Sequence, residues 1–305
     1  MDRDATRFNI PEKSPPLHVY QTLTRQMTAS TKSYYEGHST DSYESAYFYE
    51  PGAYTEHLKQ LVQNSLQLAD AASAVDNKRR LLDIGGGTGN FTRMILEDTP
   101  TVSGVVIDPF LVESSTTTAT NDDDEDQIRF VRSPAEAFMQ SPTEDALWWR
   151  QNYHQVLLKE VVHHFQDADR VPIFQGLYNG LLPLTGDAPS LLIVTRPQRD
   201  IDYPLWDEAR QVWVKNQPSL ETFVDELKQA GFTDINHHLE AYPCTILLER
   251  WQSMVKGRFW STFSNFTDAE LDEACHKIAK GEKERIDAAG NLCFEDRLLF
   301  ITARK

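Results

Sequence analysis

Leu81-Leu82-Asp83-Ile84-Gly85-Gly86-Gly87-Thr88-Gly89-Asn90 is the stretch of sequence that decides the fold. An apolar strand leads to an acid and then to glycines at alternating positions, and a helix is predicted to begin near Phe91. Glycine lets the backbone turn sharply, and it lets a ligand approach the amide groups without a β-carbon in the way. The stretch therefore predicts a ligand-binding turn between a strand and a helix.

Strand and helix patterns alternate after this turn. Apolar residues at helical spacing predict helices at 58–75, 168–182, 219–230, 246–256 and 268–280. Short apolar runs predict strands at 80–84, 101–107, 128–131, 154–158, 191–195, 232–239 and 291–303. This order predicts an α/β fold: a doubly wound, Rossmann-like sheet, mostly parallel with an antiparallel edge strand, plus a helical cap or lid.

The chain is long enough for one large domain with insertions. We expect residues 1–57 to form an N-terminal tail and lid helices, and residues 58–305 to form the main domain. Cap insertions are expected near 197–218 and 241–290.

Composition excludes several classes of function. Forty-six acidic residues against thirty basic ones give a formal net charge of −16, which disfavours nucleic acids and anionic membranes as partners. The three cysteines show no short paired spacing, so neither a disulfide framework nor a metal site is expected. No apolar run approaches membrane-spanning length, and the first residues do not resemble a secretory signal. We expect a cytoplasmic protein.

The glycine loop does not match the common phosphate-binding patterns. A P-loop needs Lys followed by Ser or Thr after the last glycine, where this chain has Asn90 and Phe91. The dinucleotide pattern starting at Gly85 needs glycine or alanine where Asn90 stands. Asp83 would also repel a pyrophosphate, but it suits a ligand with an ammonium group. At the end of the next strand, Asp108 can accept hydrogen bonds from both hydroxyls of a ribose.

Five segments together resemble the class I S-adenosylmethionine-dependent methyltransferases: 81–92, Asp108, 132–138, 159–165 and 223–232. The resemblance implies S-adenosylmethionine as cofactor, S-adenosylhomocysteine as product, no metal, and a small-molecule methyl acceptor. It implies that cofactor contacts are made by Asp83, Gly85, Gly87, Gly89, Asp108, Pro109, Ser133, Ala135 and Lys159. Pro134 stands where this family usually has an acid that contacts the adenine, so Ser133 and the amide of Ala135 are the expected substitutes.

The acceptor site is less well defined by the sequence. His163 and His164 are candidate bases for a hydroxyl or amine acceptor, or structural residues at the end of a strand. An acceptor carboxylate could pair with Arg196 or with Arg258, although a surface ion pair is the alternative for both. Aromatic candidates for contact with the substrate are Tyr34, Tyr35, Tyr47 and Trp206, with packing as the alternative. His237 and His238 alternate along a strand and are expected at the surface.

The predicted function is therefore N- or O-methylation of a small metabolite, with a carboxylate-bearing metabolite as one candidate. Two alternatives are S-methylation of a small thioether or thiol acid, and binding of the cofactor without turnover by a partner or regulatory protein. The sequence does not determine the acceptor atom, the need for a base or the oligomeric state.

Overall fold

A mixed β-sheet forms the centre of the computed structural model, which describes residues 51–69, 79–110, 127–140, 152–184 and 186–305. The strand order in this sheet is β3-β2-β1-β4-β5-β7-β6. The strands are β1 (Arg79–Ile84), β2 (Val102–Ile107), β3 (Ile128–Val131), β4 (Gln155–Lys159), β5 (Leu191–Thr195), β6 (Thr233–Leu247) and β7 (Asn291–Arg304). β1 to β5 pair in parallel, whereas β7 runs antiparallel to both β5 and β6. The doubly wound, mostly parallel sheet is thus confirmed, with the antiparallel strand β7 lying just inside the edge strand β6.

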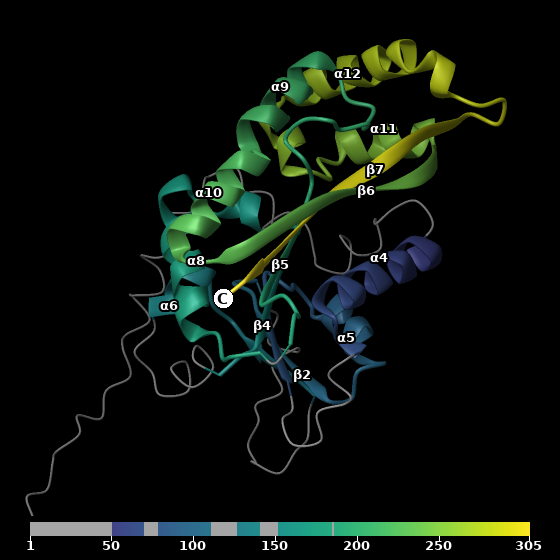
Figure 1. Ribbon diagram of the computed structural model, residues 1–305. Coiled ribbons are helices and arrows are strands. Elements are labelled where there is room, and N and C mark those ends of the chain that lie inside the picture. The colour runs from purple at the N-terminus through teal and green to yellow at the C-terminus, as the bar shows by residue number, and fades with distance from the viewer. Residues whose placement is uncertain (1–50, 70–78, 111–126, 141–151, 185) are drawn as a thin grey trace, which may run out of the picture.

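Helices cover both faces of the sheet (Figure 1). Residues that alternate along one strand enter two different cores: Leu82 packs into the core shared with α8 and α10, and Leu81 into the core shared with α4 and α5. Burial on both faces explains why the central strands read as continuous apolar runs. The covering helices are α4 (Pro51–Leu66), α5 (Asn90–Leu96), α6 (Ala135–Gln140), α8 (Asp167–Gly180) and α10 (Leu220–Ala230).

Strands β6 and β7 form a long ribbon that reaches past the carboxyl ends of the parallel strands. Thr195, the last residue of β5, pairs with Leu299 of β7, but β6 and β7 stay paired as far as Leu247 and Asn291. This extension carries the helical cap (Figure 1). The cap consists of α9 (Asp207–Asn216), α11 (Leu248–Lys256), η5 (Ser261–Asn265), α12 (Asp268–Gly281) and η6 (Lys283–Arg285).

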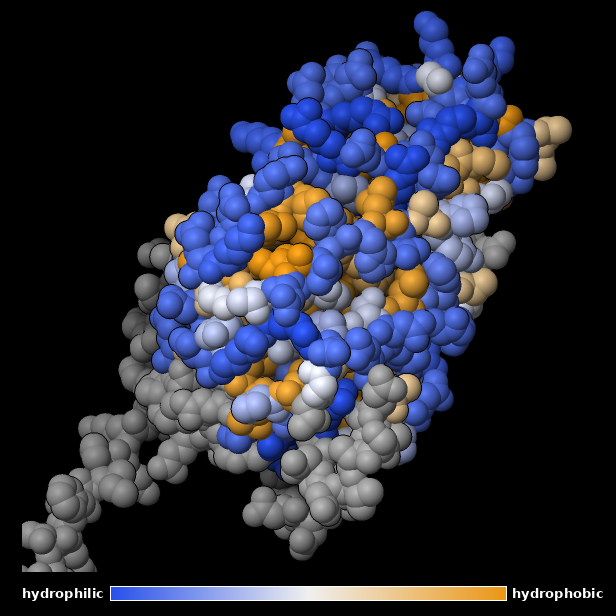
Figure 2. All heavy atoms as spheres, in the orientation of Figure 1, coloured by the Kyte–Doolittle hydropathy of each residue, from blue (hydrophilic) through white to orange (hydrophobic). Residues whose placement is uncertain are grey.

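The cap has an aromatic core of its own, which includes Trp206, Trp213, Trp251 and Phe263. The outer surfaces of the helices are mostly hydrophilic, and apolar atoms show mainly between them (Figure 2).

The ribbon is the main difference from the predicted elements. The strand expected to stop at residue 239 continues to Leu247, and the helix expected from residue 246 begins at Leu248. Cys244 and Ile246 are buried in the cap core, whereas their neighbours Thr245 and Leu247 are exposed. Alternate burial of this kind requires an extended strand, in which successive side chains point to opposite faces. Ser219 caps α10, and Thr267 and Glu270 form a capping box on α12, which sets where these helices begin.

Candidate functional site

The glycine loop, residues 85–89, joins β1 to α5 at the carboxyl edge of the sheet. The Gly85 amide donates to the Ile107 carbonyl at 2.7 Å and so ties the loop to the end of β2. Gly87 and Gly89 have φ angles of 57° and 74°, in the left-handed region that favours glycine. A β-carbon at Gly89 would lie 2.5 Å from the Phe130 ring, whereas one at Gly87 would meet no atom of the described residues within 4 Å. Open space over Gly87 therefore lets a ligand approach the backbone.

Asp83 is a buried carboxylate directly before this loop. Its side chain is 2% exposed, and the Thr92 hydroxyl donates to Oδ2 at 2.5 Å. Burial raises the pKa of Asp83 to about 6, and the Thr92 hydrogen bond and the Lys159 charge oppose that rise. At neutral pH the carboxylate is therefore ionised but poorly solvated, so a cationic group bound beside it would be favoured.

Asp108 follows β2 and is linked to the same loop. The Gly87 amide donates to Oδ2 at 3.1 Å, and the Phe110 amide donates to Oδ1 at 2.7 Å. Burial raises the pKa of Asp108, while these two amide bonds lower it. Each carboxylate oxygen has a second lone pair, which could accept from the hydroxyls of a ribose. Pro109 lies half-buried between Asp108 and Phe110.

The segment after β3 lies against the end of β2. The Ser133 amide donates to the Asp108 carbonyl at 3.3 Å, and the Ser133 hydroxyl donates to the Pro134 carbonyl at 3.0 Å. Pro134 directly precedes α6, where its restricted φ suits the start of a helix. Ala135 is buried at the first position of α6. Ser133 is thus held beside Asp108, and contact of Ser133 and Ala135 with the adenine stays a prediction.

Lys159 ends β4, the strand that pairs with β1 on the other side. Its ammonium lies 4.8 Å from the centroid of the Phe91 ring, and its charge lowers the pKa of Asp83. The structure therefore places Lys159 beside the glycine loop.

His163 and His164 lie on η4 (Val162–His164), directly after β4, with their ring centroids 4.0 Å apart. Burial lowers the pKa of His163 to about 4. The pKa of His164 is lowered well below its usual range by burial and by its neighbour His163. Both imidazoles are therefore neutral at physiological pH and weak as bases. Nδ1 of His163 is buried without a hydrogen-bond partner among the described residues.

Arg196 follows β5 and is 5% exposed. Its guanidinium forms an ion pair with Glu160 and donates to the Tyr203 hydroxyl at 2.7 Å. Its Nε also lies 3.6 Å from Asp296 Oδ1. The predicted role in binding a substrate carboxylate does not fit this geometry, because carboxylates from β7 and from the end of β4 already surround the guanidinium.

The ion pair belongs to a larger buried cluster, which we call the Arg196 network: Tyr54, Glu160, Arg196, Tyr203 and Asp296. Tyr54 on α4 donates to Asp296 Oδ2 at 2.5 Å, and Tyr203 donates to Asp296 Oδ1. Of these residues, only Arg196 was singled out from the sequence. The available signal was an acid within or next to an apolar strand, at Glu160 and at Asp296.

The other predicted acceptor-site residues have different surroundings. Trp206 is 6% exposed and stacks on Phe263 inside the cap core. Arg258 donates to the Phe266 carbonyl at 3.0 Å and pairs with Asp268 at 2.6 Å, so its guanidinium has partners within the cap. The three tyrosines predicted to contact the substrate lie outside the described residues: Tyr34, Tyr35 and Tyr47.

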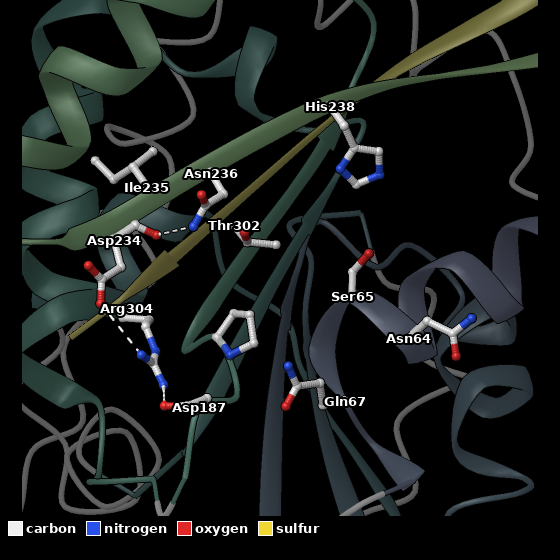
Figure 3. A pocket seen from close by; sticks show the side chains of 11 residues that line it. Asn64, Ser65, Gln67, Asp187, Asp234, Ile235, Asn236, His238, Thr302 and Arg304 are labelled. Atoms are coloured by element: carbon white, nitrogen blue, oxygen red, sulfur yellow. Dashed lines mark hydrogen bonds and ion pairs between the residues drawn. The ribbon is translucent and has the colours of Figure 1, made fainter.

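A separate groove of 540 Å³ lies near the start of β5, at the end of the sheet opposite the carboxyl ends of the parallel strands (Figure 3). Arg304 on its wall pairs with Asp187 at 2.7 Å and with Asp234 at 3.5 Å. The predicted surface position of His237 and His238 is confirmed, and His238 lines this groove. The groove does not belong to the site at the glycine loop. Within the described ranges, no helix is long and apolar enough to cross a bilayer, and no three potential ligand residues gather into a metal site.

A family model for the O-methyltransferase domain matches residues 21–194, which is more than half of the chain and includes the glycine loop, Asp108 and the histidine pair. The chain belongs to the O-methyltransferase domain family. The resemblance to class I methyltransferases is thereby confirmed. The match to the family model ends at Val194, and the cap follows after that residue in the chain.

Two curated relatives of this O-methyltransferase domain come from Ocimum basilicum. Eugenol O-methyltransferase is 26% identical over 140 residues, which cover 46% of this chain and 34% of that protein. Chavicol O-methyltransferase is 23% identical over 189 residues, which cover 57% of this chain and 48% of that protein. The chain thus aligns with less than half of the length of either relative.

Similar solved structures are methyltransferases as well. A phosphoethanolamine N-methyltransferase from Haemonchus contortus, solved with S-adenosylhomocysteine, has a TM-score of 0.45 and 15% identity, and the match covers 93% of this chain and 60% of that one. Human N-acetylserotonin methyltransferase, solved with S-adenosylmethionine, has a TM-score of 0.39 and 17% identity, with 73% and 58% covered.

Proposed function

We propose that this protein transfers a methyl group from S-adenosylmethionine to a hydroxyl group of a small molecule. The observation that carries the proposal is the pair of buried carboxylates, Asp83 and Asp108, on either side of the open backbone at Gly87. One carboxylate suits the ammonium of the cofactor, and the other suits its ribose. Membership of the O-methyltransferase domain family favours oxygen as the acceptor atom.

The residues of the site would act mainly by binding and orientation. The bound cofactor supplies an electrophilic methyl group, so the protein has to align the acceptor with that group and exclude water. The cap is carried past the carboxyl edge of the sheet by β6 and β7, and in this proposal it would help to exclude water. His163 can accept a proton from the acceptor, but with a pKa of about 4 it contributes little driving force. A phenolic hydroxyl, which is more acidic than an alcohol, is therefore the acceptor that this site would handle best.

The weak base favours one competing function, methyl transfer to a thioether sulfur, because that reaction releases no proton. The carboxylate-bearing acceptor has less support, since Glu160 and Asp296 occupy the guanidinium of Arg196.

Two measurements test the proposal. Titration calorimetry with S-adenosylmethionine and S-adenosylhomocysteine should show binding of both, and absence of binding to both would refute it. Transfer of a labelled methyl group should then be measured to eugenol and chavicol, which carry phenolic hydroxyls, and to matched amines and thioethers. Transfer to thioethers alone would establish the competing function. Binding without transfer to any acceptor would indicate a protein that binds the cofactor without turnover.

A further inference from the structure

Glu160, which follows the carboxyl end of β4, has one carboxylate oxygen for which the described residues provide no partner. Oε2 is paired with Arg196, whereas Oε1 is buried and has no hydrogen-bond partner among the described residues. The side chain is 14% exposed. The backbone of Glu160 also adopts a φ of 56°, which is unfavourable for a residue with a β-carbon. Burial of an unpaired anionic oxygen and a strained backbone both cost free energy, and such costs concentrate at sites that bind ligands.

Among the described residues, the charges of the Arg196 network do not cancel. One guanidinium, Arg196, stands between two carboxylates, Glu160 and Asp296, which leaves one formal negative charge in excess in the Arg196 network. Tyr203 stays neutral, because burial raises its pKa well above the usual range. The neighbouring cation Lys159 is directed to Phe91 and Asp83 instead. A cationic ligand would compensate this excess.

Glu160 lies next to the proposed cofactor site. The following residue, Val161, packs against the glycine loop so closely that a β-carbon at Gly85 would lie 2.4 Å from its Cγ2. β4 also pairs directly with β1, so Glu160 is one strand away from Asp83. Asp83 pairs with Leu157, three residues before Glu160, so a rise of about 3.3 Å per residue and a strand spacing of about 5 Å place the α-carbons of Asp83 and Glu160 about 11 Å apart. A ligand that extends from Asp83 along this edge of the sheet can therefore come within about 10 Å of Glu160.

We propose that Glu160 recognises the positive charge on the sulfonium of S-adenosylmethionine, and that Arg196 is the positioning residue that holds its carboxylate. This inference rests on the proposed function, in which Asp83 takes the ammonium and Asp108 the ribose. The sulfonium joins these two parts of the cofactor covalently, so it has to lie over the same edge of the sheet. S-adenosylhomocysteine carries a neutral thioether at that position and does not gain the attraction. Glu160 would therefore favour binding of the cofactor over its product and promote product release.

The test compares the dissociation constants of both ligands by titration calorimetry of the full chain. Glu160→Gln removes the charge but keeps an oxygen that can accept from Arg196. At about 10 Å in a partly buried site, loss of one charge should weaken S-adenosylmethionine binding about tenfold and change S-adenosylhomocysteine binding less than about twofold. Glu282→Gln is a matched control, because this carboxylate is also 14% exposed and also pairs with an arginine, Arg285, at 2.9 Å. It should change neither constant.

An unchanged ratio of the two dissociation constants in Glu160→Gln overturns the proposal. Equal weakening or loss of both ligands overturns it as well, because Glu160 would then only support the fold. Glu160→Asp is the second variant: it keeps the charge and should keep the ratio within about threefold of the unmodified protein, and loss of the preference there also counts against the proposal. If the unmodified protein binds neither ligand, the proposed function has failed, which is a distinct result.

Discussion

Asp83→Asn should stabilise the ligand-free protein at neutral pH, although it removes a conspicuous residue of the site. Burial raises the pKa of Asp83 from 3.8 to about 6, so the folded protein disfavours the ionised carboxylate. The asparagine side chain is uncharged and nearly the same size, and its amide oxygen can still accept from the Thr92 hydroxyl. The substitution therefore removes the cost of a buried charge at little loss of packing.

The magnitude follows from the size of this pKa shift. A rise of roughly two pKa units corresponds to about 3 kcal/mol of differential free energy between the folded and unfolded states. Between pH 3.8 and about 6 the folded state binds more protons than the unfolded state, so the free energy of unfolding falls as pH rises through this window. Above this window the full penalty is present. The variant should gain about 3 kcal/mol at pH 7.5, or roughly 5 °C in Tm, and almost nothing below pH 4.

Urea unfolding of the ligand-free protein from pH 4 to pH 8 measures this difference directly. Asp272→Asn is the control, since this exposed carboxylate pairs with Lys256 at 2.7 Å and that partner lowers its pKa. The control should change stability only slightly, and in the opposite direction. The reasoning is refuted if Asp83→Asn is less stable than the unmodified protein at pH 7.5, or if their difference does not vary with pH. A confirmed gain would mean that the protein retains a destabilising carboxylate for its ligand.

Three further perturbations test other parts of the structure. Gly87→Ala should weaken S-adenosylmethionine binding at least about tenfold, because the new β-carbon enters the space over the loop. Gly290→Ala is the control, since Gly290 has a similar positive φ of 83° and equally open surroundings. It should leave the affinity unchanged in the same calorimetry. S-adenosylmethionine affinity should fall as pH drops below about 6, where Asp83 becomes protonated, and an affinity that is constant from pH 5 to pH 8 would argue against an ammonium contact. Glu226→Ala should lower the free energy of unfolding, measured in urea, by about 3 kcal/mol, because it leaves the buried guanidinium of Arg170 without its bidentate partner. A decrease below about 1 kcal/mol would show that water replaces the carboxylate.

Much of the fold could be predicted because its signals are local. β3 and β5 have the predicted bounds, since each is a short apolar run. The ribbon was predicted too short because its outer half alternates buried and exposed residues, as at Cys244 and Ile246, and only the cap packed against it makes this alternation favourable. The helix expected from residue 246 was displaced for the same reason.

The same distinction between local signals and packing of distant elements applies to the candidate site. Asp83, the glycines and Asp108 could be recognised because strand, acid, turn and helix follow one another in the chain, and a parallel sheet always brings the ends of neighbouring strands to one edge. The surroundings of Arg196 could not be recognised, because Tyr54 and Asp296 are 242 residues apart and meet only when α4 packs beside β7.

The sequence by itself therefore determined the family, the order of strands and helices, and the acids at the glycine loop, since these depend on residue types at short and regular spacing. Only the tertiary structure decided the charge states of the buried groups and their hydrogen-bond and ion-pair partners. Burial set the pKa of Asp83 and made His163 a weak base, and the pairing of distant strands gave Arg196 internal carboxylates. Within the part of the chain that the structure describes, it also left one oxygen of Glu160 without a hydrogen-bond partner. Solvation and pairing depend on every element packed around a group, so they could not be derived from its neighbours in the chain.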